Sequence, residues 1–321
     1  MPNSDDRPVV VLTRTADPTA DLVITELTAR GVPVARFDPA DFPLSVRLTA
    51  RLGGGAGLTG RIRLLAGNRE VDLADVRAVY YRRPSPFTFL TLAPEDRPWA
   101  IAQARYGLGG VLMALPGCRY VNHPDAVAAA EPKPVQLATA HAVGLPAPPT
   151  IVTDSVDDAR AFAAEVGPIV YKPIHHAPYH KDGRPAAVWT TEVDPSQFDA
   201  TIRQTAHLFQ AKIDKVADVR VTVVGDRVFA AIARDAELDW RTRQDRLAWQ
   251  PVEPPSETVK AMLAYLDRFG LAFGCFDFAV DHAGRWWFLE CNPNGQWAFI
   301  QEKTGIPIAA AFADLLATGR A

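Results

Sequence analysis

The chain has 321 residues, of which 48% are hydrophobic and 22% are charged, and its formal net charge is -3. This length can hold two or three modules that each bury a core, and the composition is ordinary for a globular enzyme. A net charge so close to zero excludes a general attraction to nucleic acid or to an anionic membrane, so neither is an expected partner. No apolar run approaches the roughly 20 residues that a membrane-spanning helix needs.

Cysteine usage and the N-terminal residues indicate a cytoplasmic protein. The three cysteines, Cys118, Cys275 and Cys291, form no CxxC pair and have no metal-like spacing. Cysteines of this kind are typical of a reducing compartment, where a buried thiol is a small apolar residue. The first residues, MPNSDDRP, are polar and acidic, unlike the start of a secretory signal.

The first predicted domain, residues 1–125, begins as a small parallel α/β unit. A β-branched strand at 8–14, helical apolar spacing at 17–30 and a second strand at 32–38 follow one another. The rest of the domain is expected to contain a buried strand at 78–84, ending near Arg82 and Arg83, and a helix at 95–117.

A β-hairpin is predicted in the middle of this domain. Residues 44–52 and 60–66 alternate apolar and polar side chains around Gly53-Gly54-Gly55. The glycines could also form a phosphate-binding loop. Such a loop needs amides at a helix N-terminus, and no helix start follows, so we interpret the glycines as a turn.

The second and third predicted domains cover residues 126–215 and 216–321. In the second we expect helices at 131–143 and 155–166, a strand at 168–174, a mobile loop at 175–188 and a further helix to about His207. In the third we expect strands at 219–225, 227–233, 275–281 and 286–292, and helices at 256–269 and 307–318.

Three polar residues on the last predicted hairpin form the strongest chemical pattern. Glu290 and Asn292 lie two residues apart on one strand and so face the same side, and Asp277 lies on the neighbouring strand. A carboxylate embedded in an apolar strand is costly unless a positive group pairs with it. Oxygen ligands of this kind suit Mg²⁺. The alternative is that Asp277 and Glu290 cap turns or pair with arginines.

Four cations accompany this acidic hairpin. Lys172 interrupts the apolar strand PIVYKPI, and Arg220 lies in the strand DVRVTVVG. Lys133 starts a helix, where the positive end of the macrodipole disfavours a cation unless an anion lies beside it. Arg241 follows the turn LDW. Each cation alone is typical of a solvated surface, but together with an acidic metal hairpin they resemble what phosphoryl transfer requires.

The order of these segments resembles the ATP-grasp superfamily over residues of about 126–321. The matching segments are EPKPVQL, VYKPI, FQAKID and FDFAV followed by FLECNPNGQW. The resemblance implies an α/β protein with the ATP-grasp fold and an N-terminal pre-ATP-grasp α/β domain. Within the superfamily the chain is similar to the graspetide maturases, the microviridin-type macrocyclases of ribosomal peptides, in the phrases YYRRP, AxxxGLPAPPTIVTD, DVRVTVVGDRVFAA, ELDWR and LECNPNGQWAFIQEKTGIPI.

The resemblance implies a role for each candidate site residue. Contacts with the ATP phosphates are assigned to Lys133 and Lys172, and the adenine hinge to Gln210, Lys212 and Ile213. Magnesium binding is assigned to Asp277, Glu290 and Asn292. Arg220 is expected to stabilise the transferring phosphoryl group, and Arg241 to lie near the acyl phosphate. The loop after Lys172 departs from the family, because it lacks the compact Gly/Ser-rich form of a phosphate lid.

The implied activity is that of an ADP-forming ligase that uses ATP and Mg²⁺. Enzymes of this family join Asp or Glu side chains of a precursor peptide to Ser, Thr or Lys side chains, as ω-esters or ω-amides, and recognise a leader segment of the precursor. Two alternatives stay open: an ATP-grasp ligase that adds an amino acid to a small molecule or protein tail, and a non-catalytic peptide-binding protein regulated by nucleotide. A homodimer is also left open. Arg82 and Arg83 are candidates to meet acidic substrate groups, or else they cap a strand.

Overall fold

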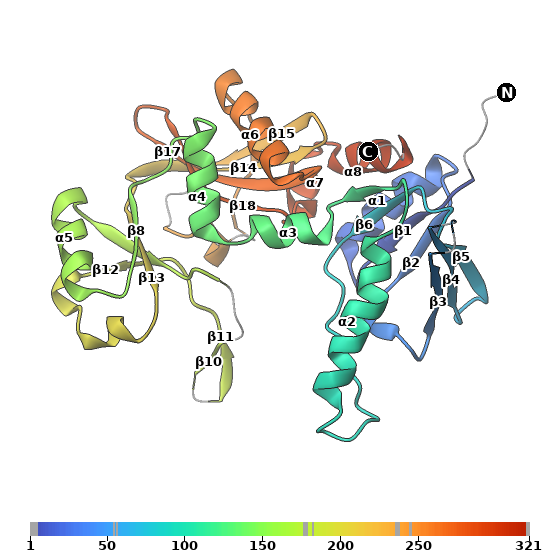
Figure 1. Cartoon of the computed structure of the whole chain (residues 1–321). Helices are drawn as coiled ribbons and strands as arrows, with labels where there is room; N and C mark the ends of the chain where they lie inside the picture. Colours follow the sequence, from blue (N-terminus) through green and yellow to red (C-terminus); the bar gives the residue numbers. More distant parts are fainter. Residues whose placement is uncertain are drawn as a thin grey trace.

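The computed structural model describes residues 6–53, 55, 57–175, 179–181, 183–234, 238–243 and 246–318. Figure 1 shows three groups of elements: a first region that contains α1 and α2, a central region below α6, and an outer region that contains α5. Both helices and sheets are present, so the predicted α/β class is confirmed. Among the described residues, no helix is both long and apolar enough to cross a membrane.

A four-stranded parallel sheet forms the first region. Its strand order is β2 (Val34–Phe37), β1 (Val9–Leu12), β6 (Ala78–Tyr81) and β7 (Arg119–Val121). Helix α1 (Pro18–Ala29) connects β1 to β2, and the Asp17 side chain caps it by accepting hydrogen bonds from the Thr19 and Ala20 amides. The predicted strand–helix–strand order is confirmed. Helix α2 (Arg97–Met113) lies within the predicted range.

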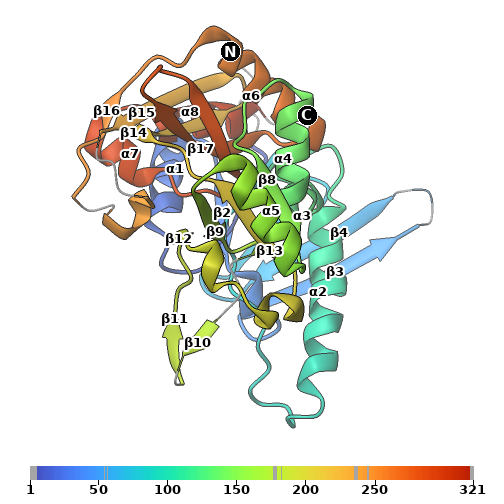
Figure 2. The same ribbon diagram turned by 90° about the vertical axis from the view of Figure 1, so that its left-hand side faces the viewer.

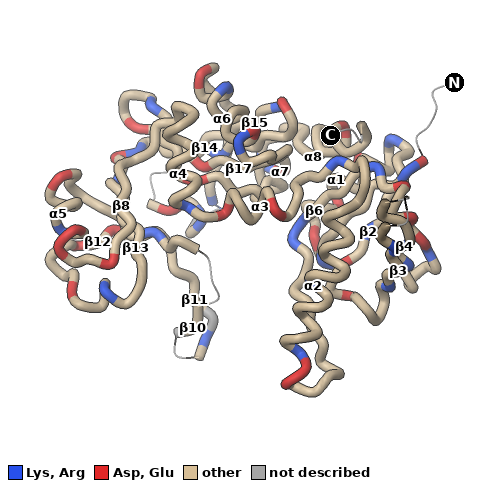
Figure 3. The backbone as a smooth tube through the Cα atoms, viewed as in Figure 1, with Lys and Arg blue, Asp and Glu red and all other residues tan. Residues whose placement is uncertain are grey.

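A separate antiparallel sheet projects from this region (Figure 2). It consists of β3 (Val46–Leu52), β4 (Leu58–Leu64) and β5 (Arg69–Asp72), so the predicted hairpin is confirmed, whereas its third strand was not predicted. A strand and not a helix follows the glycine run, of which Gly54 lies outside the described residues. Gly60 has no room for a side chain, because a Cβ there would lie 2.1 Å from the Thr49 carbonyl oxygen. Both β3 and β4 carry basic residues at intervals along their length (Figure 3).

The outer region contains a smaller antiparallel sheet. Its order is β12 (Thr191–Val193), β9 (Ile169–Lys172), β13 (His207–Ala211) and β8 (Thr150–Thr153). Helix α5 (Val156–Val166) packs on it, with Ala159 and Ala163 buried. Helix α3 (Pro124–Ala130) leads from the first region to α4 (Lys133–Ala142), whose bounds lie within the predicted helix.

The helix predicted to reach His207 is wrong. That stretch contains β12 and two short 3-10 helices, η2 (Pro195–Gln197) and η3 (Ala200–Gln204). Asp194 and Asp199 each accept a backbone hydrogen bond at the start of one of them, a local alternative that Asp side chains offer against a regular helix. The predicted loop at 175–188 contains a short hairpin, β10 (Tyr179–Lys181) and β11 (Arg184–Ala186), while residues 176–178 and 182 lie outside the described chain.

The central region is a five-stranded sheet with helices on it. Its order is β16 (Gln250–Pro251), β15 (Arg227–Ala233), β14 (Lys215–Val224), β17 (Phe273–Asp281) and β18 (Trp286–Asn292). Helix α6 (Ser256–Phe269) buries Met262 and Tyr265 against it. Helix α8 (Ile308–Thr318) was predicted, whereas α7 (Ala298–Thr304) and η4 (Trp240–Arg243) were not. Phe312 of α8 packs on Tyr80 of β6 with ring centroids 5.3 Å apart, so the first and central regions share one core.

Candidate functional site

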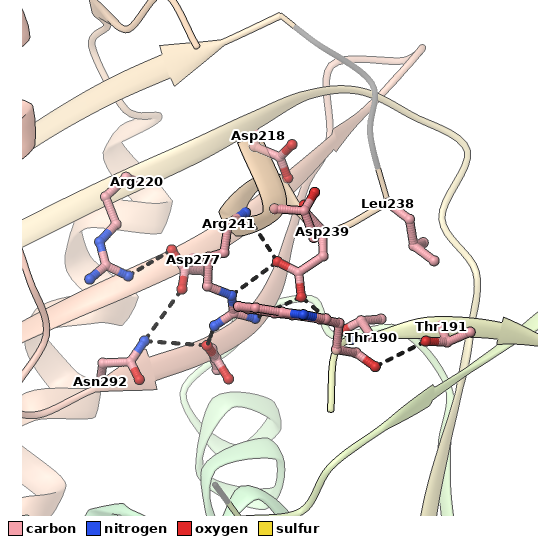
Figure 4. A network of polar contacts seen from close by, with 12 residues as sticks. Thr190, Thr191, Asp218, Arg220, Leu238, Asp239, Arg241, Asp277 and Asn292 are labelled. Atoms are coloured by element: carbon pink, nitrogen blue, oxygen red, sulfur yellow. Dashed lines mark hydrogen bonds and ion pairs between the residues drawn. The ribbon is translucent and has the colours of Figure 1, made fainter. Parts of the chain in front are cut away.

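Two acidic residues of the β17–β18 hairpin lie at one point of the central sheet. Asp277 and Glu290 are cross-strand partners, and both side chains are buried. The Asn292 amide nitrogen lies 3.3 Å from Asp277 Oδ2 and 3.3 Å from Glu290 Oε1 (Figure 4). The strand pairing therefore brings together the three residues that were expected to bind magnesium. Cys291, between two of them in the sequence, is buried in the core on the other face.

Glu290 is surrounded by cations from several elements. Lys133 Nζ, at the start of α4, lies 3.2 Å from Glu290 Oε2, and Arg241 Nη1 donates a hydrogen bond to Glu290 Oε1 at 2.7 Å. Burial alone raises the pKa of Glu290, but Arg241, Lys133 and Lys172 outweigh it and hold the pKa well below its usual range. Glu290 is therefore ionised in the folded protein.

Arg220 holds Asp277 from the neighbouring strand β14. Its Nη1 donates to Asp277 Oδ1 at 2.8 Å, and its Nη2 donates to the Gln296 carbonyl at 2.8 Å. Burial raises the pKa of Asp277 despite Arg220, and nearby Glu290 adds to the rise. The guanidinium fits because residue 295 is glycine: a Cβ there would lie 2.8 Å from Arg220 Nη2.

Lys172, at the end of β9, is buried and bonded to an amide. Its Nζ donates to Gln210 Oε1 at 2.9 Å, and Gln210 Nε2 donates to Thr150 Oγ1 at 2.9 Å. Burial lowers the pKa of Lys172 to about 8, although the nearby Glu290 opposes the change. A buried ammonium that is paired only with a neutral amide is stabilised when an anion binds next to it.

One cavity, of about 60 Å³, lies where the smaller sheet meets the central sheet. Seven of the predicted site residues line it: Lys172, Gln210, Lys212, Ile213, Arg241, Asp277 and Glu290. An adjoining cavity of about 10 Å³ is lined by Lys133 together with Lys172, Arg241 and Glu290. Pockets that hold drug-sized ligands are usually about 300 Å³ or larger, so the cavity in this structure is small for a nucleotide.

Several residues at this site were not recognised in the sequence. Asp239 accepts from Arg241 Nε at 3.0 Å and thereby orients the guanidinium toward Glu290 (Figure 4). Gln136 exchanges two hydrogen bonds with the Cys291 backbone, at 2.9 and 3.0 Å, which fixes α4 to β18. Gln136 lies three residues after Lys133, so helical spacing places both on one face and could have indicated it.

A second buried ion pair borders the same cavity. Lys215 Nζ lies 2.6 Å from Asp218 Oδ1, and both residues line the cavity next to Lys212 and Ile213. Burial raises the pKa of Asp218 to about 6, and Lys215 opposes the rise. Neither residue was singled out in the sequence, because Lys and Asp three residues apart in a strand give no pattern of their own.

Arg82 neither caps a strand at the surface nor faces the cavity. It is fully buried, and its Nη1 donates to the Asn294 carbonyl at 2.8 Å while Nη2 donates to the Gln296 side chain. The nearest carboxylate is that of Asp17, 3.7 Å from Arg82 Nε. Asn122 adds a bond of 2.8 Å to the Pro293 carbonyl. The first region therefore holds the loop that follows Asn292 and that also bonds to Arg220.

The donor set at the hairpin fits a magnesium ion. The site has two carboxylates and one amide, and within the described part of the chain no three His, Cys, Asp or Glu side chains lie together as a metal site. A metal here would use the oxygens of Asp277, Glu290 and Asn292, and it would need further oxygens from a ligand or water, as Mg²⁺ commonly does. The alternative expectation, that the acids pair with arginines, describes contacts that are also present.

Known proteins resemble this chain along most of its length. Residues 8–128 match the model of the MvdD pre-ATP grasp domain. A RiPP-associated ATP-grasp ligase of Chryseobacterium gregarium, solved in complex with ADP and with a leader and core peptide, is 26% identical, with 97% of this chain and 96% of that chain covered and a TM-score of 0.89. The sequence has no match among curated proteins.

Two further solved structures agree with this similarity. Macrocyclase MdnC of Microcystis aeruginosa MRC, bound with the precursor peptide MdnA, is 26% identical over 96% of this chain and 98% of that chain, with a TM-score of 0.83. The ATP-grasp ligase PsnB, complexed with minimal precursor, Mg and ADP, is 25% identical over 99% of both chains, with a TM-score of 0.77. The chain therefore carries an MvdD-type pre-ATP-grasp domain at residues 8–128, and over its whole length it resembles ATP-grasp ligases and macrocyclases of ribosomal peptides.

Proposed function

We propose that the protein is a graspetide macrocyclase. It uses ATP to activate Asp or Glu side chains of a ribosomal precursor peptide and joins them to Ser, Thr or Lys side chains as ω-esters or ω-amides. The observation that carries the proposal is the cavity in which a buried lysine, a hinge segment and an acidic hairpin meet. The complexes of similar ligases with precursor peptides support a peptide as the substrate.

In this proposal the cations of the cavity bind the nucleotide. Lys133 and Lys172 contact the phosphates, and the ammonium of Lys172 leaves Gln210 to do so. The adenine ring lies against the hinge residues Gln210, Lys212 and Ile213, which line the same cavity. Arg220 and Arg241 spread the negative charge that develops on the transferring phosphoryl group and on the acyl phosphate.

Asp277, Glu290 and Asn292 hold magnesium. The ion would supply positive charge that offsets the negative charge of the phosphates, which otherwise repels an incoming carboxylate. Glu290 is already ionised without the metal, since the surrounding cations depress its pKa. Arg241 then has two possible partners, the Asp239 and Glu290 carboxylates, and it can stay on Asp239 when a metal takes Glu290.

The reaction follows in two balanced steps. A carboxylate oxygen of the peptide attacks the γ-phosphorus, the bond from that phosphorus to the β–γ bridging oxygen breaks, and ADP leaves. The peptide now carries a mixed carboxylic–phosphoric anhydride. A hydroxyl or amine of the same peptide adds to the carbonyl carbon and loses its proton, and inorganic phosphate leaves as the ester or amide forms. The β10–β11 hairpin, which follows Lys172, would close over the bound nucleotide during the reaction and exclude water from the anhydride.

The test uses a candidate precursor peptide, chosen among short open reading frames near the gene for a core rich in Asp or Glu and in Ser or Thr. The peptide is incubated with the protein, ATP and magnesium, and its intact mass and the ADP released are measured. Loss of one water per linkage, with one ADP formed for each, is the expected result. A gain equal to an amino-acid residue would instead indicate a ligase for small molecules or protein tails. Absence of ADP formation would indicate a nucleotide-regulated binding protein and overturn the proposal.

Two further properties belong to the proposal. A macrocyclase that acts on a newly made peptide with cellular ATP works in the cytoplasm, where the three free cysteines stay reduced. A homodimer is a further expectation, which sedimentation of the purified protein would test.

A further inference from the structure

A second and larger cavity lies in the first region of the molecule. It has a volume of about 580 Å³, shares no residue with the cavity around Lys172, and falls in the size range of ligand sites. Its walls are α2, the segment after β6, and α3, and α3 leads on to Lys133. Asn294 lines its end. This residue comes two positions after Asn292, so the groove reaches the acidic hairpin.

Aromatic side chains give the groove an apolar surface that is exposed to solvent. Tyr81, Phe87 and Tyr120 line it and are half-buried. Tyr106 of α2 stands at the groove with 77% of its surface exposed. Exposed aromatic rings beside a concave surface are typical of sites where a peptide docks, since they add contact area with little loss of side-chain freedom.

Two arginines that line the groove have no acidic partner among the described residues. Arg83 and Arg105 line it, and neither has a carboxylate within salt-bridge distance among the described residues. Arg83 has a positive φ of 40°, a backbone conformation that a non-glycine residue seldom adopts and that is found at ligand clamps. Its Nε donates only a long bond, 3.4 Å, to the Asn294 carbonyl, which directs the guanidinium toward the hairpin end of the groove.

The groove also carries two carboxylates. Asp125 and Glu131, at the two ends of α3, line it. A ligand that satisfies both kinds of charge carries carboxylates as well as hydroxyl or ammonium groups. Asp or Glu acceptors together with Ser, Thr or Lys nucleophiles give a peptide this pattern.

We propose that this groove binds the segment of the peptide substrate that carries the reacting side chains. The inference rests on the proposed function for its substrate class. The acidic side chains face Arg83 and Arg105, the nucleophile side chains face Asp125 and Glu131, and the peptide passes Asn294 into the site around Glu290. Helix α2, which lines the groove, and the β10–β11 hairpin point to the same side of the molecule (Figures 1 and 2).

The experiment measures peptide affinity separately from nucleotide affinity. Arg105→Gln, Arg105→Lys and Tyr106→Ala are compared with Arg51→Gln, which removes an exposed arginine of the distant β3 strand. A charge-assisted hydrogen bond is worth enough to change affinity by about tenfold. We expect Arg105→Gln and Tyr106→Ala to raise the KM for the precursor about tenfold, Arg105→Lys to restore much of it, and Arg51→Gln to have no effect. The KM for ATP and the melting temperature stay unchanged throughout.

The outcomes separate this inference from the proposed function. If the wild-type protein cyclises the peptide and Arg105→Gln and Tyr106→Ala keep its KM, the groove is not the substrate site. If the wild-type protein binds a fluorescently labelled precursor without cyclising it, the proposed function is wrong, and loss of anisotropy in Arg105→Gln would still support the groove. Absence of binding to the wild-type protein would overturn both.

Discussion

Two regions of this protein are rich in charged side chains, which are largely buried in one region and exposed to solvent in the other. Around Glu290 the carboxylates are buried, the cations Lys133 and Arg241 are half-buried, and both cations contact Glu290 from other elements. On the β3–β4–β5 sheet, Arg63 Nε donates to Glu70 at 2.7 Å, but these side chains are 46% and 44% exposed. Arg47 is even the cross-strand neighbour of Arg63, which is tolerable because water and salt screen the like charges.

The comparison shows that a short distance alone does not measure what an ion pair contributes. A buried charge that loses its partner keeps its full desolvation penalty, whereas an exposed charge regains its hydration. The buried cluster is therefore where substitutions should have large effects. The exposed sheet serves as the internal control.

The largest effect is expected at the centre of the buried cluster. Glu290→Gln keeps the shape of the side chain but removes the charge that three cations surround. We expect ligase turnover to fall by roughly 100-fold or more, the magnitude seen when one charge-stabilising group is removed. The measurement is ADP release with saturating peptide and ATP, on protein whose near-UV circular dichroism shows that it is folded. Turnover at the wild-type rate would remove Glu290 from the site.

Arg82 allows the contribution of a buried cation outside the cavity to be measured. Arg82→Met removes the cation beside the Asp17 carboxylate and the donor to the Asn294 carbonyl, and should lower the free energy of unfolding by about 3 kcal/mol in urea denaturation. Arg82→Met combined with Asp17→Asn should recover part of this loss, because no buried charge then stays unpaired. Equal losses in the single and double variants would contradict the explanation. Arg47→Met, on the exposed sheet, is the control.

The pKa of Lys172 predicts a pH dependence of nucleotide binding. Because burial holds this pKa to about 8, the lysine loses its proton as pH rises through 8, while phosphate binding favours the charged form. ADP affinity should fall by up to tenfold for each unit of pH above about 8, with uptake of up to one proton on binding. Calorimetry at pH 8.5 in buffers of different ionisation enthalpy measures the uptake. Lys172→Arg should abolish it, and uptake that persists in this variant would assign the proton elsewhere.

The lowered pKa of Lys172 also makes the free energy of unfolding depend on pH. An unfolded lysine has a pKa near 10.5, above the folded value of about 8, so the unfolded chain binds the proton more tightly. The free energy of unfolding should therefore rise between pH 8 and pH 10.5 through this residue. The rise should be absent in Lys172→Met.

The smallest effect is expected on the exposed sheet. The double variant Arg63→Gln/Glu70→Gln removes a short ion pair, yet its urea midpoint should equal that of the wild type within error. A clear loss of stability would show that these charges are less well hydrated than their exposure indicates.

Local patterns in the sequence predicted much of the fold. Alternation over residues 44–52 and 60–66 gave the β3–β4 hairpin, and apolar runs gave four of the five strands of the central sheet, all except β16. The helix expected before His207 failed because Asp194 and Asp199 stabilise local turns, which a count of helical spacing does not include. The short strands β5, β10 and β11 were not found, since three or four residues carry too little periodicity.

Local patterns also predicted part of the candidate site. Glu290 and Asn292 share a strand face by alternation alone, and their chemical types already indicate a cation site. Their placement beside Lys133, however, depends on Gln136 bonding to the Cys291 backbone, a contact between residues 155 positions apart.

The sequence by itself determined which side chains carry charge and which face of a strand or helix each occupies, because those properties depend on neighbours within one turn or one pleat. Only the tertiary structure decided which charges are buried and paired. It buried Arg82 in the core next to the Asn294 carbonyl, placed Lys172 against Gln210, and left Arg83 and Arg105 along a groove with no carboxylate partner among the described residues. Burial and pairing depend on packing between segments far apart in the chain, which local sequence patterns do not contain.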